Sequence, residues 1–403
     1  MKKGALAGIK VLEYGEFISA PYCCKLMADL GAEVIKVELP PSGDESRRYG
    51  PFPEDVPHPE RSGLFLYLNA NKKAITLNPK HPTGAVFFED LVLRTDILVE
   101  NWPVGSMAAQ GLDYQRLSRI NPRLIMTSIS PFGQIGPYAK WKAYSLNVSH
   151  GGAVAKGIGS PGREPLAPPG QQSHFFGACN AAAATMVALW ERESSGIGQY
   201  LDISEMDCLA TLFNGVWHSK YLYGHEEIIR LGNRTNLPIY PWTVLRCKDG
   251  FISAHALEEA QWQRLVELMG NPEWAQDPRF DKGIKRSQHA EELDARIESW
   301  FASRTKAEIF RICQERKIPF SPIQDVREVV ESPHLREREY FVKMHHPEAG
   351  EVTCPGPPYK LSETPWALRG EAPLLGQHNE EVFCSLLGRS KEGLAKLREE
   401  GVI

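Results

Sequence analysis

The stretch GIKVLEYGEFISAPYCCKLMADLGAEVIKVE, residues 8–38, decides the fold. Its first part, GIKVLEYG, is a short β-rich run and predicts a strand over residues 8–15. Pro21 then begins a helix that Gly31 ends, and EVIKVE predicts a second strand over 33–38. Strand, helix and strand make a β-α-β unit, in which a right-handed crossover connects parallel strands.

The same alternation continues down the chain. Strands are expected at residues 72–78, 96–101 and 123–130, and helices at 81–94 and 113–120. Strands that alternate with helices predict an α/β fold with a Rossmann-like, doubly wound sheet.

Beyond residue 130 the sequence changes character. Residues 131–172 are rich in Gly and Pro and predict a long loop region, and a long helix is expected over about 175–193. Helices rich in Glu, Arg and Trp around the strand at 250–256 indicate a smaller α+β domain. The expected division is a large domain over 1–200, a linker helix over 201–225, the small domain over 226–335, and a return linker with the rest of the large domain over 336–403.

The composition is that of an ordinary globular protein. The chain has 403 residues, 42% of them hydrophobic, and a net charge of -4, which gives no electrostatic reason to expect nucleic acid or an anionic membrane as partner. No signal-peptide core or membrane-length apolar run occurs, so the cytoplasm is expected. The eight cysteines are scattered without the spacing of a metal or redox motif.

Two motifs suggest a function, but neither lies in the sequence context that this function requires. GIGSPG, with Gly157, Gly159 and Gly162, matches a dinucleotide pattern, but the prolines that follow forbid the helix that this pattern requires. Ser173 and His174 are chain neighbours, whose side chains usually diverge, so a Ser-His nucleophile is not expected there. A helix-capping or loop role is the more natural one for Ser173.

Two polar clusters fall near strands. Lys72 and Lys73 open one strand, while Asn101 and Trp102 follow another at the end where α/β sheets collect ligands. The lysines suit phosphates, and Trp102 suits stacking on an adenine. A solvated surface turn explains the same residues equally well.

Taken together, these motifs resemble family III CoA-transferases, the group of formyl-CoA and carnitine CoA-transferases that includes α-methylacyl-CoA racemases. The resemblance rests on the opening β-α-β stretch with its GD-x-x-R continuation, and covers nearly the whole chain. Further matching segments are NANKK, VENW, GLDYQRLSRINPRLIMTSISPFGQIGPY, SSGIGQYLDISEMDCL and APLLGQHNEEV.

The resemblance implies two subunits threaded through each other and a binding site for coenzyme A, used as a substrate rather than as a tightly bound cofactor. No metal is implied. By motif position, the implied CoA contacts are Phe17, Ile18, Ser19, Lys72, Lys73, Asn101, Trp102 and Lys142.

In this family one aspartate attacks the acyl-CoA thioester and carries the acyl group and then CoA as covalent intermediates. It lies four residues before the glycine that opens the long helix. That glycine corresponds to Gly177, so Ser173 holds the aspartate's position. A serine ester is too weakly activated to pass its acyl group to a carboxylate, so Ser173 does not preserve the mechanism.

Other positions depart from the family pattern in the same way. Ser145 replaces an acidic residue, Ser149 a glutamine and Ala109 an arginine suited to the phosphates of CoA, and the glycine-rich lid is missing near 231–246. The racemase alternative needs a histidine and acids as proton shuttles in this same region, so these substitutions argue against it as well.

We therefore expect a non-catalytic subunit of a heteromeric CoA-transferase, partnered by a paralogue that keeps the aspartate. The resemblance is greatest to the two-subunit enzyme that moves CoA from succinyl-CoA to benzylsuccinate. Two alternatives stay open. One is an independently active enzyme with Glu16 or Glu164 as nucleophile, and the other is a CoA-binding protein without turnover.

Overall fold

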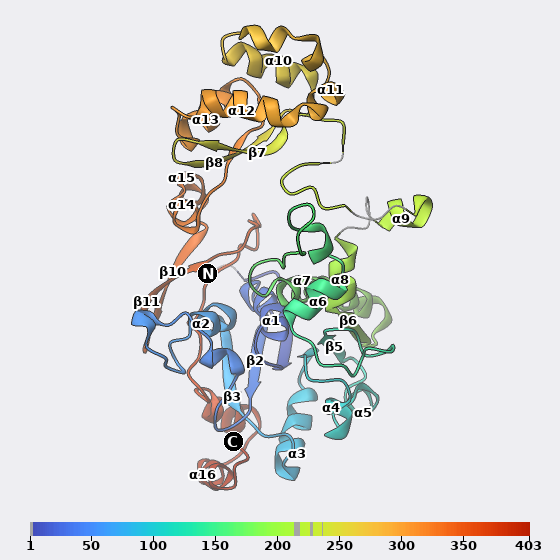
Figure 1. Ribbon diagram of the computed structural model, residues 1–403. Helices are drawn as coiled ribbons and strands as arrows, with labels where there is room; N and C mark the ends of the chain where they lie inside the picture. Colours follow the sequence, from blue (N-terminus) through green and yellow to red (C-terminus); the bar gives the residue numbers. More distant parts are fainter. Residues whose placement is uncertain (1–2, 213–217, 226–228, 236) are drawn as a thin grey trace. The chain divides into compact units, whose positions relative to one another are not determined.

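The computed structural model of the chain describes residues 3–212, 218–225, 229–235 and 237–403 (Figure 1). These residues form two compact units. The first comprises residues 1–155, 167–227 and 337–403, and the second 156–166 and 228–336. Residues 213–217 of the expected linker helix and residues 226–228 at the start of the expected small domain lie outside the described part.

A six-stranded parallel sheet forms the centre of the first unit, in the order β3-β2-β1-β4-β5-β6. The strands are β1 (Lys10–Tyr14), β2 (Glu33–Glu38), β3 (Lys72–Thr76), β4 (Ile97–Glu100), β5 (Ile125–Ser130) and β6 (Tyr200–Ser204). This arrangement confirms the predicted doubly wound sheet. The strand order reverses between β1 and β4, and ligands of such sheets bind at the carboxyl ends of the strands beside that point.

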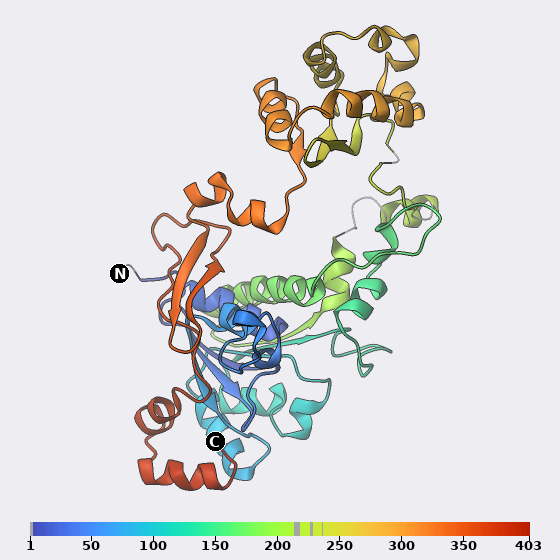
Figure 2. The same ribbon diagram turned by 60° about the vertical axis from the view of Figure 1, so that its left-hand side comes forward.

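Helices cover both faces of the sheet (Figure 2). Successive residues of each strand point to opposite faces, and apolar residues at both sets of positions form a core on each face. On one face, α1 (Ser19–Asp29) and α7 (Gln172–Ser195) pack small side chains against Val11, Val99 and Ile125. On the other face, α3 (Pro82–Val92), α4 (Ser106–Ala109) and α5 (Tyr114–Ile120) pack against Leu12 and Leu98. The sheet is therefore buried on both sides.

Two helix boundaries differ from the sequence prediction. Helix α1 starts two residues before Pro21, because the first helical turn tolerates proline. Helix α7 starts at Gln172 rather than near residue 175, which places Ser173 and His174 in its first turn and not in the preceding loop. The side chain of Ser173 makes no capping hydrogen bond. Helix α7 ends just before Gly196, which has φ of +76°, a conformation that glycine adopts readily.

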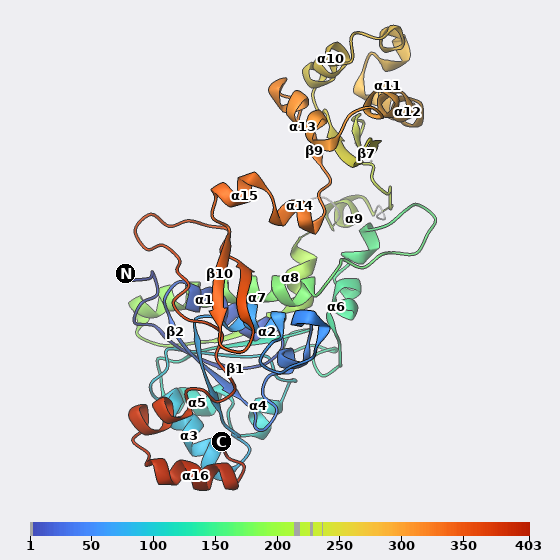
Figure 3. The same cartoon turned by 90° about the vertical axis from the view of Figure 1, so that its left-hand side faces the viewer.

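Shorter elements complete the first unit. They are α2 (Gly63–Asn69), α6 (Ser145–Gly151), α8 (Glu205–Thr211), α9 (Ser219–Gly224) and the strands β10 (Phe341–His346) and β11 (Gly350–Pro355). The antiparallel hairpin β10-β11 packs on α2 through Met344 and Phe65 (Figure 3). A π-helix at Glu381–Leu386 and α16 (Lys391–Glu399) then add Phe383 and Leu397 to the core beside α3.

The second unit has its own core around Trp262, Leu293 and Phe320. Its strands β7 (Trp242–Cys247), β8 (Gly250–His255) and β9 (Ser321–Pro322) form a small antiparallel sheet. Its helices are α10 (Glu259–Leu268), α11 (Gly283–Gln288), α12 (Ala290–Phe301), α13 (Lys306–Glu315) and α14 (Val326–Val330), and α15 (Pro333–Glu337) spans the boundary. Besides residues 228–336, this unit takes residues 156–166.

Throughout the described residues, every helix is too short or too polar to cross a membrane.

Candidate functional site

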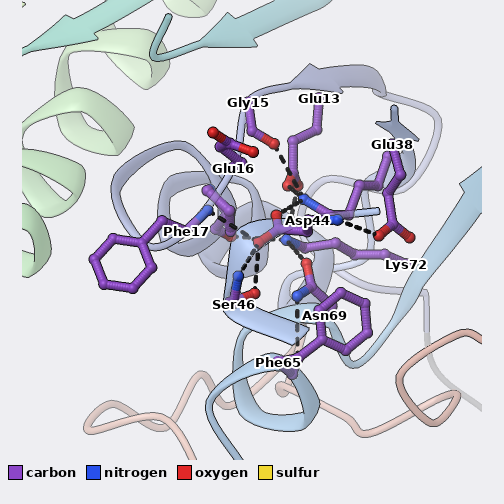
Figure 4. A network of polar contacts seen from close by, with 12 residues as sticks. Glu13, Gly15, Glu16, Phe17, Glu38, Asp44, Ser46, Phe65, Asn69 and Lys72 are labelled. Atoms are coloured by element: carbon purple, nitrogen blue, oxygen red, sulfur yellow. Dashed lines mark hydrogen bonds and ion pairs between the residues drawn. The ribbon is translucent and has the colours of Figure 1, made fainter. Parts of the chain in front are cut away.

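The turn that leaves β1 lies at the switch point of the sheet and is held by side chains from elsewhere (Figure 4). Asn101, which follows β4, donates from Nδ2 to the carbonyl of Glu16 at 2.8 Å and accepts the Glu16 N–H at 2.9 Å. Asp44 accepts the N–H of Phe17, whose φ of +68° is unusual for a bulky residue. Two separate loops thus fix a strained turn at the start of α1.

Glycine is required at the head of this turn. A Cβ on Gly15 would lie 2.5 Å from Oδ1 of Asn101 and 2.6 Å from Cβ of Ala20. The absence of a side chain lets Asn101 reach the backbone. The helix that follows starts with Ile18 and Ser19 buried, and the hydroxyl of Ser19 accepts from Nδ2 of Asn101 at 2.9 Å.

A buried network of charged side chains holds Asp44, which in turn holds the turn (Figure 4). Lys36 bridges Glu13 and Asp44 at 2.6 Å each, and Lys72 contacts the second oxygen of Glu13 at 2.7 Å. Burial by itself raises the pKa values of Glu13 and Asp44. Lys36 and Lys72 hold the pKa of Glu13 below normal, and Lys36 with hydrogen bonds from Ser46 does the same for Asp44. The carboxylate that positions Phe17 is therefore kept ionised.

The structure does not present Lys72 to a ligand. Its ammonium group has no exposed surface and is satisfied by Glu13, Asn69 and the carbonyl of Pro21. A CoA phosphate at Lys72, as the resemblance implies, does not fit this placement. Lys73 is one-third exposed and bridges Glu33 and Glu381 at 2.8 Å each, so it lies on the surface already paired.

A pocket of about 480 Å³ opens on the α3 face of the sheet at the carboxyl ends of β1 and β4. It is lined by Tyr14, Pro79, Lys80, Pro82, Ala85, Trp102, Ser106, Ala109 and Gln110. The rings of Tyr14 and Trp102 lie 5.2 Å apart, and the exposed Lys80 supplies a cation. Aromatic walls and one ammonium group suit a purine base that carries phosphate.

Of this lining, only Trp102 and Ala109 were named from the sequence, and Tyr14, Lys80 and Gln110 were among the residues missed. Lys80 follows β3 and precedes α3, so the rule that ligands gather at carboxyl ends of strands was sufficient to find it. Gln110 carried no such signal, because its role depends on a hydrogen bond from the hydroxyl of Tyr14 across 96 residues.

Ser173 lies on the opposite face of the sheet, in the first turn of α7. Its side chain is completely buried, and its hydroxyl has no hydrogen-bond partner among the described residues. The neighbouring His174 directs Nδ1 to Glu205, 2.8 Å and 2.9 Å from the two carboxylate oxygens. No base therefore contacts Ser173.

His174 is nevertheless placed beside the turn after β1. Its ring lies 5.7 Å from that of Phe17, which also contacts Tyr49 at 4.8 Å. Gly177 makes room for this arrangement, since a Cβ there would lie 2.8 Å from Cγ of Glu205. The structure thus brings Phe17, Asn101 and Trp102 together at the switch point, with His174 against Phe17.

The other predicted positions are more scattered. Ser145 and Ser149 are buried on α6, which packs against α7. Lys142 is exposed, with its ammonium group 5.5 Å from the ring centre of Tyr144. In the described residues no cluster of three or more His, Cys, Asp or Glu side chains is suited to hold a metal ion.

Comparison with known proteins identifies the family of this chain. The sequence profile described as CoA-transferase family III matches residues 6–379. The chain belongs to CoA-transferase family III. It is 34% identical over 402 residues to succinyl-CoA–D-citramalate CoA-transferase of Chloroflexus aurantiacus, covering 99% of this chain and 98% of that protein.

Two further proteins are similar to this chain along their whole length. The succinyl-CoA–L-malate CoA-transferase β subunit of the same organism is 32% identical over 408 residues, with 99% of this chain and 98% of the relative covered. A crystal structure of a CaiB/BaiF family protein from Brucella suis superposes with a TM-score of 0.86 at 28% identity, covering 96% of this chain and 100% of that one. The family III fold and CoA-transferase membership predicted from the sequence are confirmed.

Proposed function

We propose that this chain is the non-catalytic subunit of a heteromeric family III CoA-transferase, interlocked with a paralogous subunit that supplies the nucleophilic aspartate. The observation that carries the proposal is the state of Ser173. Its hydroxyl is sealed from solvent, and the nearest candidate base, His174, is bound to Glu205. A nucleophile must reach the thioester and lose its proton, and Ser173 meets neither condition.

The chemistry of transfer points the same way. A carboxylate that attacks a thioester forms an anhydride, whose acyl group remains activated while CoA leaves as thiolate. A serine hydroxyl would form an ester, and return of that acyl group to CoA or to an acid would be uphill. Even an accessible Ser173 would therefore halt the cycle at its first intermediate.

The pocket beside Trp102 supports retention of a CoA-binding function. The half-buried ring of Trp102 can pack against the adenine, and Lys80 can meet a phosphate at the rim. Ala109 lies in the same lining, where family members often carry an arginine. The resulting loss of a bidentate phosphate contact favours weak rather than tight binding of CoA.

For the substrates, we propose succinyl-CoA as the CoA donor and a dicarboxylic acid such as benzylsuccinate as the acceptor. Two relatives named as succinyl-CoA-dependent transferases support the donor, and one of them is named as a β subunit, which supports a heteromer. The acceptor rests on the sequence resemblance alone. The eight free cysteines fit the reducing cytoplasm, where we place the enzyme.

Glu16 is the basis of a second candidate function, an active enzyme with a displaced nucleophile. Its carboxyl group is half-buried, and Figure 4 shows it turned away from the buried network. Burial raises its pKa, with Asp44 and Glu45 adding to the effect. Glu164 is less suited, since it lies exposed on a loop of the second unit.

The experiment compares the purified chain alone, its complex with a co-expressed paralogue that carries the aspartate, and the same complex with Ser173→Ala. Each is assayed for CoA exchange between succinyl-CoA and a panel of dicarboxylates. We expect turnover only in the complex, and Ser173→Ala within twofold of wild type. Turnover by the chain alone that Glu16→Gln abolishes would establish the second candidate instead, and CoA binding without turnover in any complex would indicate a binding protein.

A further inference from the structure

A row of polar side chains crosses the sheet directly under the Trp102 pocket. Tyr14 of β1 pairs in register with Glu100 of β4, which pairs with Ser128 of β5. Residues in register on neighbouring parallel strands point to the same face, so these three side chains lie side by side. Glu100, the last residue of β4, is only 3% exposed.

The carboxyl group of Glu100 holds the first turn of chain after β4. Its Oε2 accepts the backbone N–H of Trp102 at 2.7 Å. The indole of Trp102 packs 5.2 Å from the ring of Tyr14, and both rings line the pocket. The bond to Glu100 therefore sets the direction in which Trp102 enters the pocket wall.

No cation compensates this carboxyl group within the described residues. The titratable groups around it are the phenols of Tyr14 on β1 and Tyr200 on β6, both of which have their pKa raised by burial and further by Glu100. Asp202 follows Ser128 in the same row, but its carboxylate accepts from the N–H of Gln134. Lys80 is exposed at the pocket rim.

This environment makes the charge of Glu100 sensitive to pH near neutrality. Burial raises the pKa of Glu100 to about 7, and hydrogen bonding from the Ser128 side chain and from the backbone N–H of Trp102 only partly opposes that effect. An ionised carboxylate accepts a hydrogen bond about twice as strongly as a neutral group does. The hydrogen bond from the Trp102 N–H to Glu100 is therefore stronger above neutral pH than below it.

We propose that Glu100 is a positioning residue, whose carboxylate fixes Trp102 in the orientation that shapes the pocket for the adenine of a CoA thioester. The ligand part of this inference rests on the proposed function. The control of the Trp102 segment by Glu100 does not, because it follows from the hydrogen bond and the burial of the carboxyl group.

The test measures the affinity of CoA for the full-length chain by titration calorimetry at pH 6 and pH 8. The phosphates of CoA also titrate in this range, so Glu100→Gln, which keeps shape and an acceptor but never ionises, supplies the reference. Glu193→Gln, at an exposed carboxylate on α7, is the matched control. Glu100→Ala removes the acceptor altogether.

At pH 8 we expect Glu100→Gln to bind CoA about fivefold more weakly than wild type, as loss of charge assistance predicts. The two proteins should bind equally at pH 6, Glu193→Gln should follow wild type, and Glu100→Ala should be weakest at both values. Parallel pH profiles for wild type and Glu100→Gln would overturn the proposal. Absence of CoA binding by wild type at pH 8 would instead refute the CoA-binding part of the proposed function.

That last outcome leaves the role of Glu100 open to a ligand-free readout. The fluorescence of the unliganded protein is recorded against pH, and the contribution of Trp102 is isolated by subtracting the Trp102→Phe profile. We expect this contribution to change with a midpoint near 7 in wild type and to be flat in Glu100→Gln. A flat wild-type profile, or an unchanged midpoint in Glu100→Gln, would overturn the control of Trp102 by Glu100.

Discussion

His174 directs its Nδ1 to the buried carboxylate of Glu205, 2.8 Å away, and leaves the adjacent Ser173 hydroxyl without a partner. This pairing joins the first turn of α7 to the first turn of α8. It gives His174 a structural partner at the position where a serine nucleophile would need a base. The first turn of α7 is thus organised around Glu205 and not around Ser173.

Gly177 is the residue that permits this pairing, and Gly177→Ala tests it. The added methyl group would lie 2.8 Å from Cγ of Glu205, and we expect the free energy of unfolding to fall by about 1–3 kcal/mol in urea titrations. In a Glu205→Ala background the same substitution should cost nothing, because the obstructing side chain is gone. Equal costs in the two backgrounds would show that Glu205 is not the constraint.

Lys36 is predicted to be essential to the buried network under the turn after β1. Lys36→Met leaves Glu13 with Lys72 and deprives Asp44 of its ammonium partner, and we expect a loss of about 3–5 kcal/mol in unfolding free energy. The control is Lys73→Met, whose partners are exposed and whose cost should stay below about 1 kcal/mol. Similar costs for both lysines would contradict the assignment.

The same network predicts a dependence of stability on acid. The lowered pKa values of Glu13 and Asp44 mean that the unfolded chain binds protons more readily than the fold does. Their contribution is complete above the unfolded values of 4.5 and 3.8 and is lost as pH falls through the lower folded values. Unfolding free energies of Glu100→Gln, which lacks the opposing titration of Glu100, should fall from pH 6 to pH 3. A flat profile in this variant would contradict the network.

Glu100 predicts a trend of opposite sign. Its folded pKa of about 7 lies above the ordinary 4.5, so the fold binds the proton more tightly and stability declines as pH rises between these values. The stability of Glu100→Gln relative to wild type should therefore increase by about 3 kcal/mol from pH 4 to pH 8. Urea titrations at both pH values measure this, and a constant difference would show that Glu100 has an ordinary pKa.

Much of this arrangement is readable from the sequence, and the part that is not has a physical cause. The β-α-β order and the small residues of α7 are local patterns, and they predict the sheet and its helices correctly. From the sequence, Lys72 was assigned to the CoA site. The structure instead buries Lys72 against Glu13, a contact between residues distant in the chain that no local pattern reveals. The first turn of α7 was taken for loop, because its contacts with Glu205 are non-local and outweigh weak local signals.

The affinity of the Trp102 pocket for CoA is predicted to depend on the charges at its rim. Lys80→Ala should weaken CoA binding about fivefold at low salt, and Ala109→Arg should strengthen it several-fold by restoring a bidentate phosphate contact. Both effects should shrink as salt screens the charges. Lys10→Ala, at the amino end of β1 and away from the pocket, is the control. If neither substitution changes the affinity for CoA measured by calorimetry, CoA does not bind in this pocket.

The central claim is that this chain carries no covalent intermediate. The most direct measurement is intact-mass spectrometry of both subunits of the complex, quenched during turnover with succinyl-CoA. We predict an acyl or CoA adduct on the partner subunit alone, with the mass of this chain unchanged. An adduct on this chain, mapped to Glu16 or to any other residue, would contradict the account.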